Sequence, residues 1–236
     1  MTEPGFVLAL ETSQRAQSVA VRLHDGSVHQ EAVHADDRSQ EDLLPAVARL
    51  VDRVGSAPCD VRGVILNAGP GGFTGLRLAH AAAQAIAVAL RVPVVQVSGA
   101  ACARAAAVMA GELAPAEACW VALASKGSET WIARADGMNR PEGRSIEADA
   151  WECGACRVLI ADEHLPATWV AEVDIRSIRL LPLRVHAAAV LQAGLALLER
   201  GDVVPPEALV PAYPREAEAV RLWRLRKAGR TDGPPA

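Results

Sequence analysis

The sequence predicts an α/β fold, because strand-like and helix-like segments alternate along most of the chain. Three short apolar runs come first, and the dipeptide Asp25-Gly26 between the second and the third predicts a hairpin. A segment over residues 39–54 then carries apolar side chains at helical spacing. A glycine-rich stretch, 69–75, joins a further apolar run to an alanine-dense segment. Residues 1–98 therefore predict the order β-β-β-α-β-α-β.

The chain opens with three predicted strands, of which the last two are antiparallel. They are expected at residues 6–10, 18–23 and 28–33. The tripeptide Glu11-Thr12-Ser13 directly follows the first of them. These polar residues form a first loop that we expect to face a ligand.

The segment 39–54 is the clearest amphipathic helix of the sequence. Its apolar positions are Leu43, Leu44, Val47, Leu50, Val51 and Val54. Ser39, with Asp42 three residues later, resembles a capping box. Pro45 interrupts the pattern, so the helix either kinks there or starts near Asp42.

The next elements surround the glycine-rich stretch. Residues 61–66 are apolar apart from Arg62, which predicts a strand buried on both faces. Residues 76–90 predict a helix with unusually small side chains, since many of its positions are alanine. Residues 92–97 predict another strand, and Ser98 is a suitable N-cap for a helix that ends near Met109.

The pattern restarts after Pro115 and predicts a second group of elements. Strands are expected at 120–124, 130–135 and 157–161, a helix at 185–198, an extended proline-rich segment at 202–216 and a basic helix at 217–227. The end of the chain is expected to be flexible.

The most specific chemistry lies in the glycine loop and the helix start after it. This stretch reads Gly69, Pro70, Gly71, Gly72, Phe73, Thr74, Gly75, Leu76 and Arg77. A glycine-rich turn between a strand and a helix often presents backbone N–H groups to an anion. Thr74 is a suitable N-cap for the helix. Arg77 would lie in the first helical turn, where the helix dipole disfavours a cation, so it either has an anionic partner or is solvated.

The glycine loop does not match the two common phosphate-binding patterns. No Lys follows its last glycine, and it does not have the G-x-G-x-x-G spacing after the first strand of the chain. Two interpretations therefore stay open. The loop binds phosphate, or it is a tight turn that lets a helix pack closely on a sheet.

Composition narrows the class of protein. The chain has 236 residues, of which 51% are hydrophobic, which suits one large domain or two small ones. Its formal charge is −4, which argues against a protein that attracts nucleic acid by a net positive charge. Only 3% of its residues are aromatic, which argues against binding by base stacking. We expect neither a transmembrane helix nor a secretory signal, hence no membrane contact and a cytoplasmic location.

The remaining motifs predict neither a metal site nor a catalytic residue. Cys153 and Cys156 have C-x-x-C spacing, but no second pair completes a zinc site. The six histidines contain no pair four residues apart on a helix, and no nucleophile motif is present. Basic residues gather between 215 and 230, where a solvated tail and a contact with RNA or an acidic partner both stay open.

Four stretches of the sequence together resemble the TsaB (YeaZ) family. They are residues 7–13, 18–21, 43–45 and 69–77. The pattern G-P-G-x-F-T-G-[LV]-R in the last of them is the specific part, and the resemblance covers residues 6–98 best. It implies a two-lobed, actin-like ATPase fold of the sugar kinase, Hsp70 and actin superfamily, which is RNase H-like. The first lobe would be residues 1–98, the second 99–228, and 229–236 a flexible tail.

The resemblance also implies an activity and its partners. Members of this family act with a TsaD-like transferase and a TsaE-like ATPase to form N6-threonylcarbamoyladenosine at position 37 of tRNA, and they would reach tRNA only through the complex. TsaD carries an H-x-x-x-H metal motif, whose absence here favours a catalytically silent scaffold. The alternative is an ATP-dependent transferase or kinase of the same fold, with Glu11 and the glycine loop as phosphate elements. No tightly bound cofactor is implied, while a nucleotide at a subunit junction and a homodimer stay open.

The two helices of the first lobe are the expected partner surface. Some of the small side chains of the helix 76–90 should face outward, beside the apolar stripe of the helix 39–54, and form a weakly charged patch. The residues assigned to this surface are Leu43, Leu44, Val47, Leu76, Ala79, Ala82 and Ala83.

Overall fold

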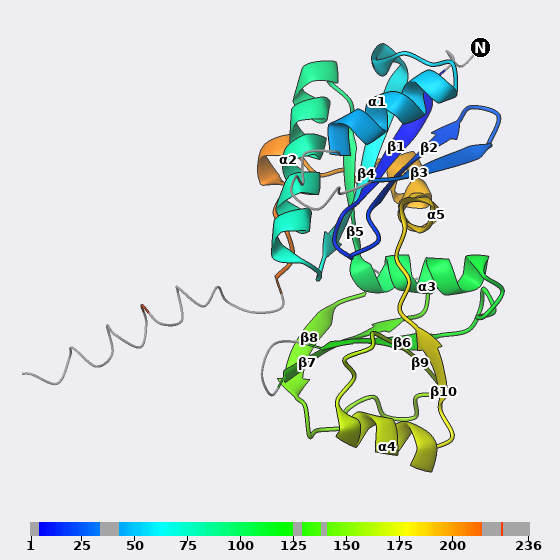
Figure 1. Cartoon of the computed structure of the whole chain (residues 1–236), viewed down its shortest axis with the longest axis vertical. Helices are drawn as coiled ribbons and strands as arrows, with labels where there is room; N and C mark the ends of the chain where they lie inside the picture. Colours follow the sequence, from blue (N-terminus) through cyan, green and yellow to red (C-terminus); the bar gives the residue numbers. More distant parts are fainter. Residues whose placement is uncertain (1–4, 34–42, 125–128, 138–140, 214–222, 224–236) are drawn as a thin grey trace, which may run out of the picture.

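The chain folds into two lobes, each built on a five-stranded sheet (Figure 1). The structure is a computed structural model that describes residues 5–33, 43–124, 129–137, 141–213 and 223.

The first sheet has the strand order β3-β2-β1-β4-β5. Its strands are β1 (Phe6–Glu11), β2 (Ser18–Leu23), β3 (Val28–Ala32), β4 (Val61–Gly69) and β5 (Val94–Ser98). The first three are antiparallel neighbours, whereas β4 and β5 run parallel to β1. This mixture follows from the connections, because a short turn can join antiparallel strands while parallel strands need a crossover such as a helix.

The second sheet has the order β10-β9-β6-β7-β8. Its strands are β6 (Cys119–Ala124), β7 (Glu129–Ala135), β8 (Gly143–Glu147), β9 (Val158–Ala161) and β10 (Arg179–Pro182). Three are again antiparallel neighbours, and β9 and β10 again run parallel to the first of them. The second sheet therefore repeats the topology of the first, and the predicted two-lobed, actin-like α/β fold is confirmed.

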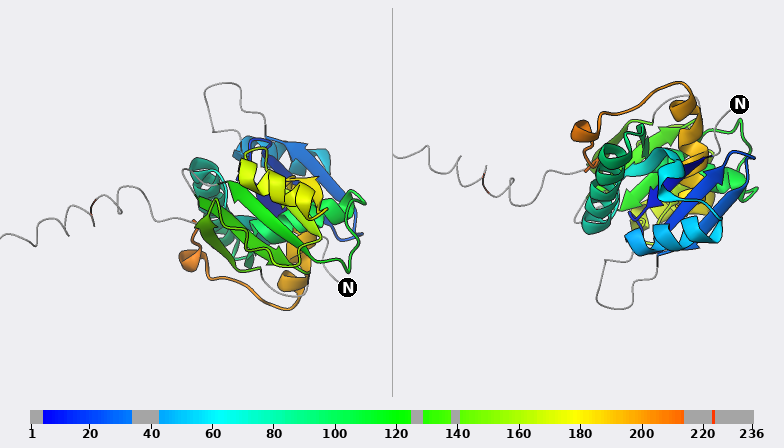
Figure 2. Two further views of the ribbon diagram at one scale, coloured as in Figure 1. Left: turned by 90° about the horizontal axis from the view of Figure 1, so that it is seen from below. Right: turned by 90° about the horizontal axis from the view of Figure 1, so that it is seen from above.

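The helices form three layers around the two sheets. They are α1 (Leu43–Arg53), α2 (Phe73–Leu90), α3 (Gly99–Met109), α4 (Ala167–Ile175) and α5 (Ala187–Glu199). Helices α1 and α2 cover the outer face of the first sheet, and α5 lies on its opposite face (Figure 2). Helix α4 packs on the outer face of the second sheet. Helices α3 and α5 contact each other between the lobes.

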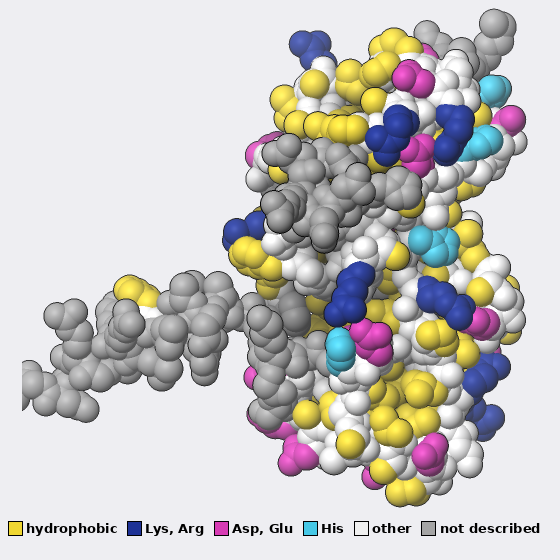
Figure 3. All heavy atoms as spheres, in the orientation of Figure 1, with side chains coloured by type: hydrophobic (Ala, Val, Ile, Leu, Met, Phe, Trp, Pro, Cys, Tyr) yellow, Lys and Arg dark blue, Asp and Glu magenta, His cyan; other side chains and the backbone are white. Residues whose placement is uncertain are grey.

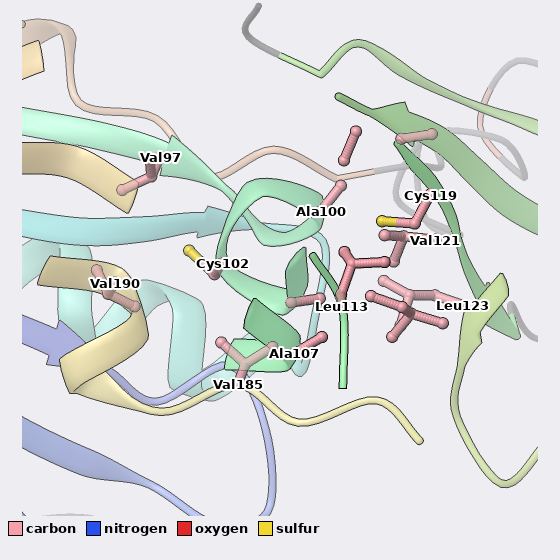
Figure 4. Close-up of a cluster of buried hydrophobic side chains, with 14 of the residues drawn as sticks. Val97, Ala100, Cys102, Ala107, Leu113, Cys119, Val121, Leu123, Val185 and Val190 are labelled. Carbon is pink, nitrogen blue, oxygen red and sulfur yellow. The ribbon is translucent and has the colours of Figure 1, made fainter. Parts of the chain in front are cut away.

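The central layer is a core that the two lobes share. Helix α5 follows the second sheet in the chain but packs on β1, β2, β4 and β5, while α3 contacts strands of both sheets. Figure 4 shows Val97 of β5, Cys102 of α3, Val190 of α5 and Val121 of β6 in this one buried cluster. The predicted boundary at residue 98 stays a prediction, but the chain returns to the first lobe well after it.

Most predicted elements are present, with different bounds. Helix α2 begins at Phe73 rather than at 76, so the prediction of Thr74 as its N-cap is wrong: Gly72 holds that position and no side chain caps the helix. Ser98 does cap α3, since its Oγ accepts a hydrogen bond from Ala101 N at 3.2 Å. Pro45 lies near the start of the described part of α1, where a missing N–H removes no helical hydrogen bond. The proposed capping pair lies outside the described residues.

Residues 203–213, here called the C-terminal strap, run back along the first lobe. Val204 N donates to Val94 O at 2.8 Å, and Ala212 N donates to Ala68 O at 2.7 Å. Leu209 packs against the buried cluster under α1 and α2. The extended segment was predicted, apart from one 3-10 turn at Pro206–Ala208 (η3). The predicted flexible tail and, apart from Trp223, the predicted basic helix lie outside the described residues.

Within the part of the chain that the structure describes, α2 has the length and apolar composition that would allow a helix to cross a membrane. It packs against the first sheet, with residues such as Leu76 and Ala83 fully buried. Core helices of globular domains meet the same two criteria.

Candidate functional site

The first loop and the glycine loop meet at one edge of the first sheet. They follow β1 and β4, which are parallel neighbours, so both loops leave the sheet at the same end. Thr12 Oγ1 donates to Gly75 O at 2.5 Å, and Gly72 N donates to Ser13 O at 2.7 Å. The structure therefore brings together the two loops that the sequence singled out.

Two glycines are required by the closeness of this contact. A Cβ atom added at Gly75 would lie 1.7 Å from Thr12 O, and one at Gly71 would lie 2.5 Å from Ser13 Cβ. Real Cβ atoms do not approach other atoms this closely. The tight-turn interpretation of the loop therefore accounts for both glycines.

Glu11 is the centre of a buried hydrogen-bond network. Its Oε1 accepts from Ser13 N at 2.6 Å and its Oε2 accepts from Asn67 Nδ2 at 2.8 Å. Asn67 also donates to Ser13 Oγ at 2.9 Å and accepts from Gly69 N at 2.9 Å. Burial raises the pKa of Glu11, although these hydrogen bonds lower it in part. Glu11 is fully buried and thus connects the two loops from behind rather than facing the solvent.

Asn67 is a site residue that the sequence analysis missed. A single polar residue near the end of an apolar strand was the available signal, because such positions lie at the edge where parallel strands meet their loops. Its amide group fits here because it can donate to Glu11 and accept from Gly69 at the same time.

A cleft of about 980 Å³ opens between the lobes in front of the two loops. Its walls are the residues 12–17, the start of α2, the residues 161–164 and the strand β10 with the chain after it. Arg15 Nη1 and Glu163 Oε1 approach to 3.5 Å across the cleft, and His164 Nε2 lies 3.5 Å from the same carboxylate oxygen. Figure 3 shows basic, acidic and histidine side chains together at the centre of this face. The volume suits a small ligand.

The donors that a phosphate would need are partly occupied. The N–H of Gly72 is bonded to Ser13 O, so it points into the protein rather than into the cleft. Thr74 does not cap the helix, and it is exposed at the cleft wall. Phosphate binding by this loop stays a prediction.

Arg77 has an unexpected environment. The sequence predicts an anionic partner or full solvation, but its guanidinium carbon lies 3.6 Å from the centroid of the Phe73 ring. Its Nε donates to the hydroxyl of Tyr213 at 3.2 Å, and the rings of Tyr213 and Phe73 are 5.2 Å apart. We call these three residues the ring cluster. Tyr213 belongs to the C-terminal strap and was not predicted as a site residue.

The predicted partner surface needs a correction, because most of the residues assigned to it face inward. Leu43, Leu76, Ala79, Ala82 and Ala83 are buried in the monomer core. Val47 is half-buried and Leu44 is exposed. The outward face of α2 instead carries Ala81, Gln84, Ala85, Val88 and Ala89. The small side chains are on both faces of the helix, and the larger group lies against the sheet.

The other candidate motifs have local contacts. Cys153 is buried, and burial raises the pKa of its thiol to about 12. The thiol of Cys156 donates to Val158 O at 3.2 Å. Among the described residues no three side chains of His, Cys, Asp or Glu gather where they could hold a metal ion. His80 is buried in α2, and its Nδ1 lies 2.6 Å from Leu76 O.

Comparisons with known proteins agree on one family. The family model for TsaD, tRNA N6-adenosine threonylcarbamoyltransferase, matches residues 29–146, which is half of the chain. The chain is 30% identical over 92 residues to the tRNA threonylcarbamoyladenosine biosynthesis protein TsaB of Escherichia coli K12, and 27% identical over 92 residues to TsaB of Bacillus subtilis 168. These matches cover 39% of this chain, and 39% and 40% of the two relatives.

A solved structure extends the likeness beyond the first lobe. YeaZ from Pseudomonas aeruginosa superimposes with a TM-score of 0.70 at 26% sequence identity. The superposition covers 89% of this chain and 99% of that one, so the second lobe is included. The sequence matches to the curated relatives, by contrast, span about two fifths of their length. Together with the loops described above, these findings show that the chain belongs to the TsaB (YeaZ) family, whose curated members are named tRNA threonylcarbamoyladenosine biosynthesis proteins.

Proposed function

We propose that this protein is a catalytically silent subunit of a complex that forms N6-threonylcarbamoyladenosine at position 37 of tRNA. Its partners would be a TsaD-like transferase and a TsaE-like ATPase. The family of the chain supports the pathway. The non-catalytic role rests on a single observation, the complete burial of Glu11.

Glu11 occupies the first loop, where the alternative enzyme would need a group that contacts a phosphate or its metal ion. Both of its carboxylate oxygens accept hydrogen bonds from inside the protein. A carboxylate that is fully buried and bonded in this way cannot contact a ligand in the cleft without breaking these bonds. It is therefore suited to holding the two loops together.

The outward faces of α1 and α2 support a role in assembly. Leu44 of α1 is 54% exposed and Val88 of α2 is 63% exposed. Exposed alanines lie near Val88 on α2, so this face has little bulk and little charge. Apolar patches of this kind tend to mark contacts with another protein. We assign the TsaD-like partner, or a second copy of this chain when the partner is absent, to this face.

Reconstitution tests the proposal. The purified TsaD-like and TsaE-like proteins, ATP, a threonylcarbamoyl donor and tRNA would be incubated with and without this chain. The modified nucleoside would then be measured by mass spectrometry. We expect the product only when the chain is present, and an unchanged yield with Glu163→Gln at the mouth of the cleft. Product formation without the chain would contradict the proposal.

The alternative, an ATP-dependent transferase or kinase, is favoured by the volume of the cleft. Titration of ATP into the isolated chain separates the two functions. Micromolar binding with turnover that Glu163→Gln reduces would support the enzyme, whereas binding without turnover would leave the scaffold role intact.

A further inference from the structure

We propose that the ring cluster binds an unpaired nucleotide of an RNA, with a base against the rings of Phe73 and Tyr213 and a phosphate on Arg77. This inference rests on the proposed function, which gives the complex an RNA substrate. It goes beyond that function because it places a direct RNA contact on this chain.

The ring cluster is exposed and ordered by its own contacts. Phe73 is 49% exposed and Tyr213 is 37% exposed, and their ring planes are tilted by 33°. The C-terminal strap fixes Tyr213, because the adjacent Ala212 is hydrogen-bonded to Ala68 at the end of β4. Figure 3 shows hydrophobic side chains and a basic one together at the level of the lower end of α2, where this helix begins.

Arg77 carries a charge without a counter-ion among the described residues. No Asp or Glu oxygen of this part of the chain lies within ion-pair distance of its guanidinium group. Its one hydrogen bond there uses Nε, which leaves the donors on both Nη atoms for a ligand. The first turn of α2 contains no acidic residue, so the positive end of the helix dipole adds to this charge.

The combination fits a nucleotide better than an acidic peptide. A peptide carboxylate would engage Arg77 alone and would leave two half-exposed rings in water. Every nucleobase has a π-face that stacks on aromatic rings and on guanidinium groups, and the attached phosphate accepts from Arg. The net charge of −4 still argues against long-range attraction of RNA, so the contact must be local.

A local contact of this kind has a measurable salt dependence. Each phosphate that a protein neutralises on a single strand contributes a slope of about −0.7 to log K against log of salt concentration. We therefore expect a slope of about −1 or smaller in magnitude for the full chain, and a slope near zero for Arg77→Ala.

The experiment measures the affinity of the full chain for a fluorescein-labelled single-stranded RNA octamer by anisotropy in low salt. Inorganic polyphosphate of similar charge serves as the probe without bases. We expect Phe73→Ala and Tyr213→Ala to weaken RNA binding at least fivefold and to leave polyphosphate binding unchanged, because stacking on one ring is worth that much by alanine substitution. Arg77→Ala should weaken both. Phe73→Trp, which keeps a ring, should retain the affinity.

Controls separate this inference from its alternatives. Arg91→Asn removes the same charge at the other end of α2, where the left-handed backbone tolerates Asn, and should leave RNA binding unchanged. Absence of RNA binding, equal loss for Arg91→Asn and Arg77→Ala, or Phe73→Ala variants that lose the TsaD-like partner but not RNA would each overturn the inference. None of these outcomes changes the reconstitution result, so a failure here is distinguishable from a failure of the proposed function.

Discussion

At Gly75 a single hydrogen atom in place of a side chain decides whether two loops can touch. Substitution by Ala places a Cβ atom 1.7 Å from Thr12 O, so the first loop or the start of α2 must move. We expect Gly75→Ala to lower the free energy of unfolding by more than about 3 kcal/mol, and Gly75→Val to prevent folding. Urea denaturation followed by circular dichroism measures this.

Gly72 provides the matched control in the same loop. Its φ of −60° suits any residue, and the nearest atom to an added Cβ is 3.4 Å away. Gly72→Ala should change the free energy of unfolding by less than about 1 kcal/mol, because alanine restricts the unfolded chain but is a poorer N-cap than glycine. Equal urea midpoints for Gly75→Ala and Gly72→Ala would contradict the explanation that Gly75 is required by close packing.

Glu11 makes the stability of the first lobe depend on pH. Burial raises its pKa above the usual 4.5, so the folded protein holds this proton more tightly than the unfolded chain. Its contribution to the free energy of unfolding therefore declines as pH rises from about 4.5 through the raised pKa. The Gln side chain of Glu11→Gln does not titrate. The free energy of unfolding of the wild type minus that of the variant should therefore decline over the same pH range.

Glu11→Gln also lowers the free energy of unfolding by an amount that does not depend on pH. The Gln amide nitrogen would face either Ser13 N or Asn67 Nδ2, both of which are donors, and we expect this conflict to cost about 1–3 kcal/mol at every pH. Denaturation at several pH values between 4.5 and 8 separates the constant part from the declining part. A difference that grows with pH would mean that the pKa is lowered instead.

Among the elements, α2 shows most clearly what a sequence can and cannot predict. Its alanines predict a helix that packs closely, and this is confirmed. The face that packs was predicted wrongly, because a helix with small residues on both sides has no strong apolar stripe to orient it. Burial of Ala79, Ala82 and Ala83 was decided by the sheet, with Leu76 in the same layer.

This orientation changes the variants that test the partner surface. Ala83 is fully buried, so Ala83→Glu should unfold the protein, since an unpaired charge in the core costs several kcal/mol. Ala85 is exposed, so Ala85→Glu should fold normally and lose the partner. Pull-down by the TsaD-like protein and circular dichroism measure the two effects.

Ala196→Glu, on the exposed side of α5, is the control for a surface charge far from α2. It should bind the partner like the wild type. If the Ala85→Glu variant folds and binds the partner with wild-type affinity, the interface lies elsewhere on the molecule.

Three elements of the second lobe escaped prediction, each for a physical reason. In β8 a single residue, Ile146, is buried, so no alternation was visible. Helix α4 buries only Trp169 and Val173, which gives a weak helical period. Strand β10 is four residues long and mostly exposed, and it exists because β9 supplies hydrogen bonds along its edge. Strands of this kind are defined by their neighbours rather than by their own residues.

For the whole molecule, the decisive feature is that α3 and α5 lie in one core with both sheets. The sequence could not predict this, because Val190 and Ile65 are far apart in the chain and both are simply apolar. The site itself was partly predictable. Its two loops were identified from polar residues and glycines that follow predicted strands. Asn67 and Tyr213 were missed, since their roles depend on which strand ends and which strap become neighbours.

A shared core predicts cooperative unfolding. Four of the five tryptophans lie in the second lobe, namely Trp120, Trp131, Trp151 and Trp169, so tryptophan fluorescence reports mainly on that lobe. Hydrogen exchange of β4 amides reports on the first lobe. We expect both to show one urea transition with the same midpoint.

The fragment 1–112 should fail to fold, because it lacks the helix that covers one face of the first sheet. Co-expression with residues 113–236 should restore a soluble protein. Two separate transitions in the full chain, or a fragment with a native near-ultraviolet spectrum, would contradict the shared core.

The order in which the ribosome delivers these elements gives the shared core a further consequence. All strands of the first sheet are present once residue 98 has been made, but α5 ends at Glu199. At about 5–20 residues per second, that interval lasts roughly 5 to 20 s. During this time the inner face of the sheet, with Ile65, Val95 and Val97, has no cover on its α5 side. The nascent chain should therefore be a client of ribosome-associated chaperones until its last helix emerges.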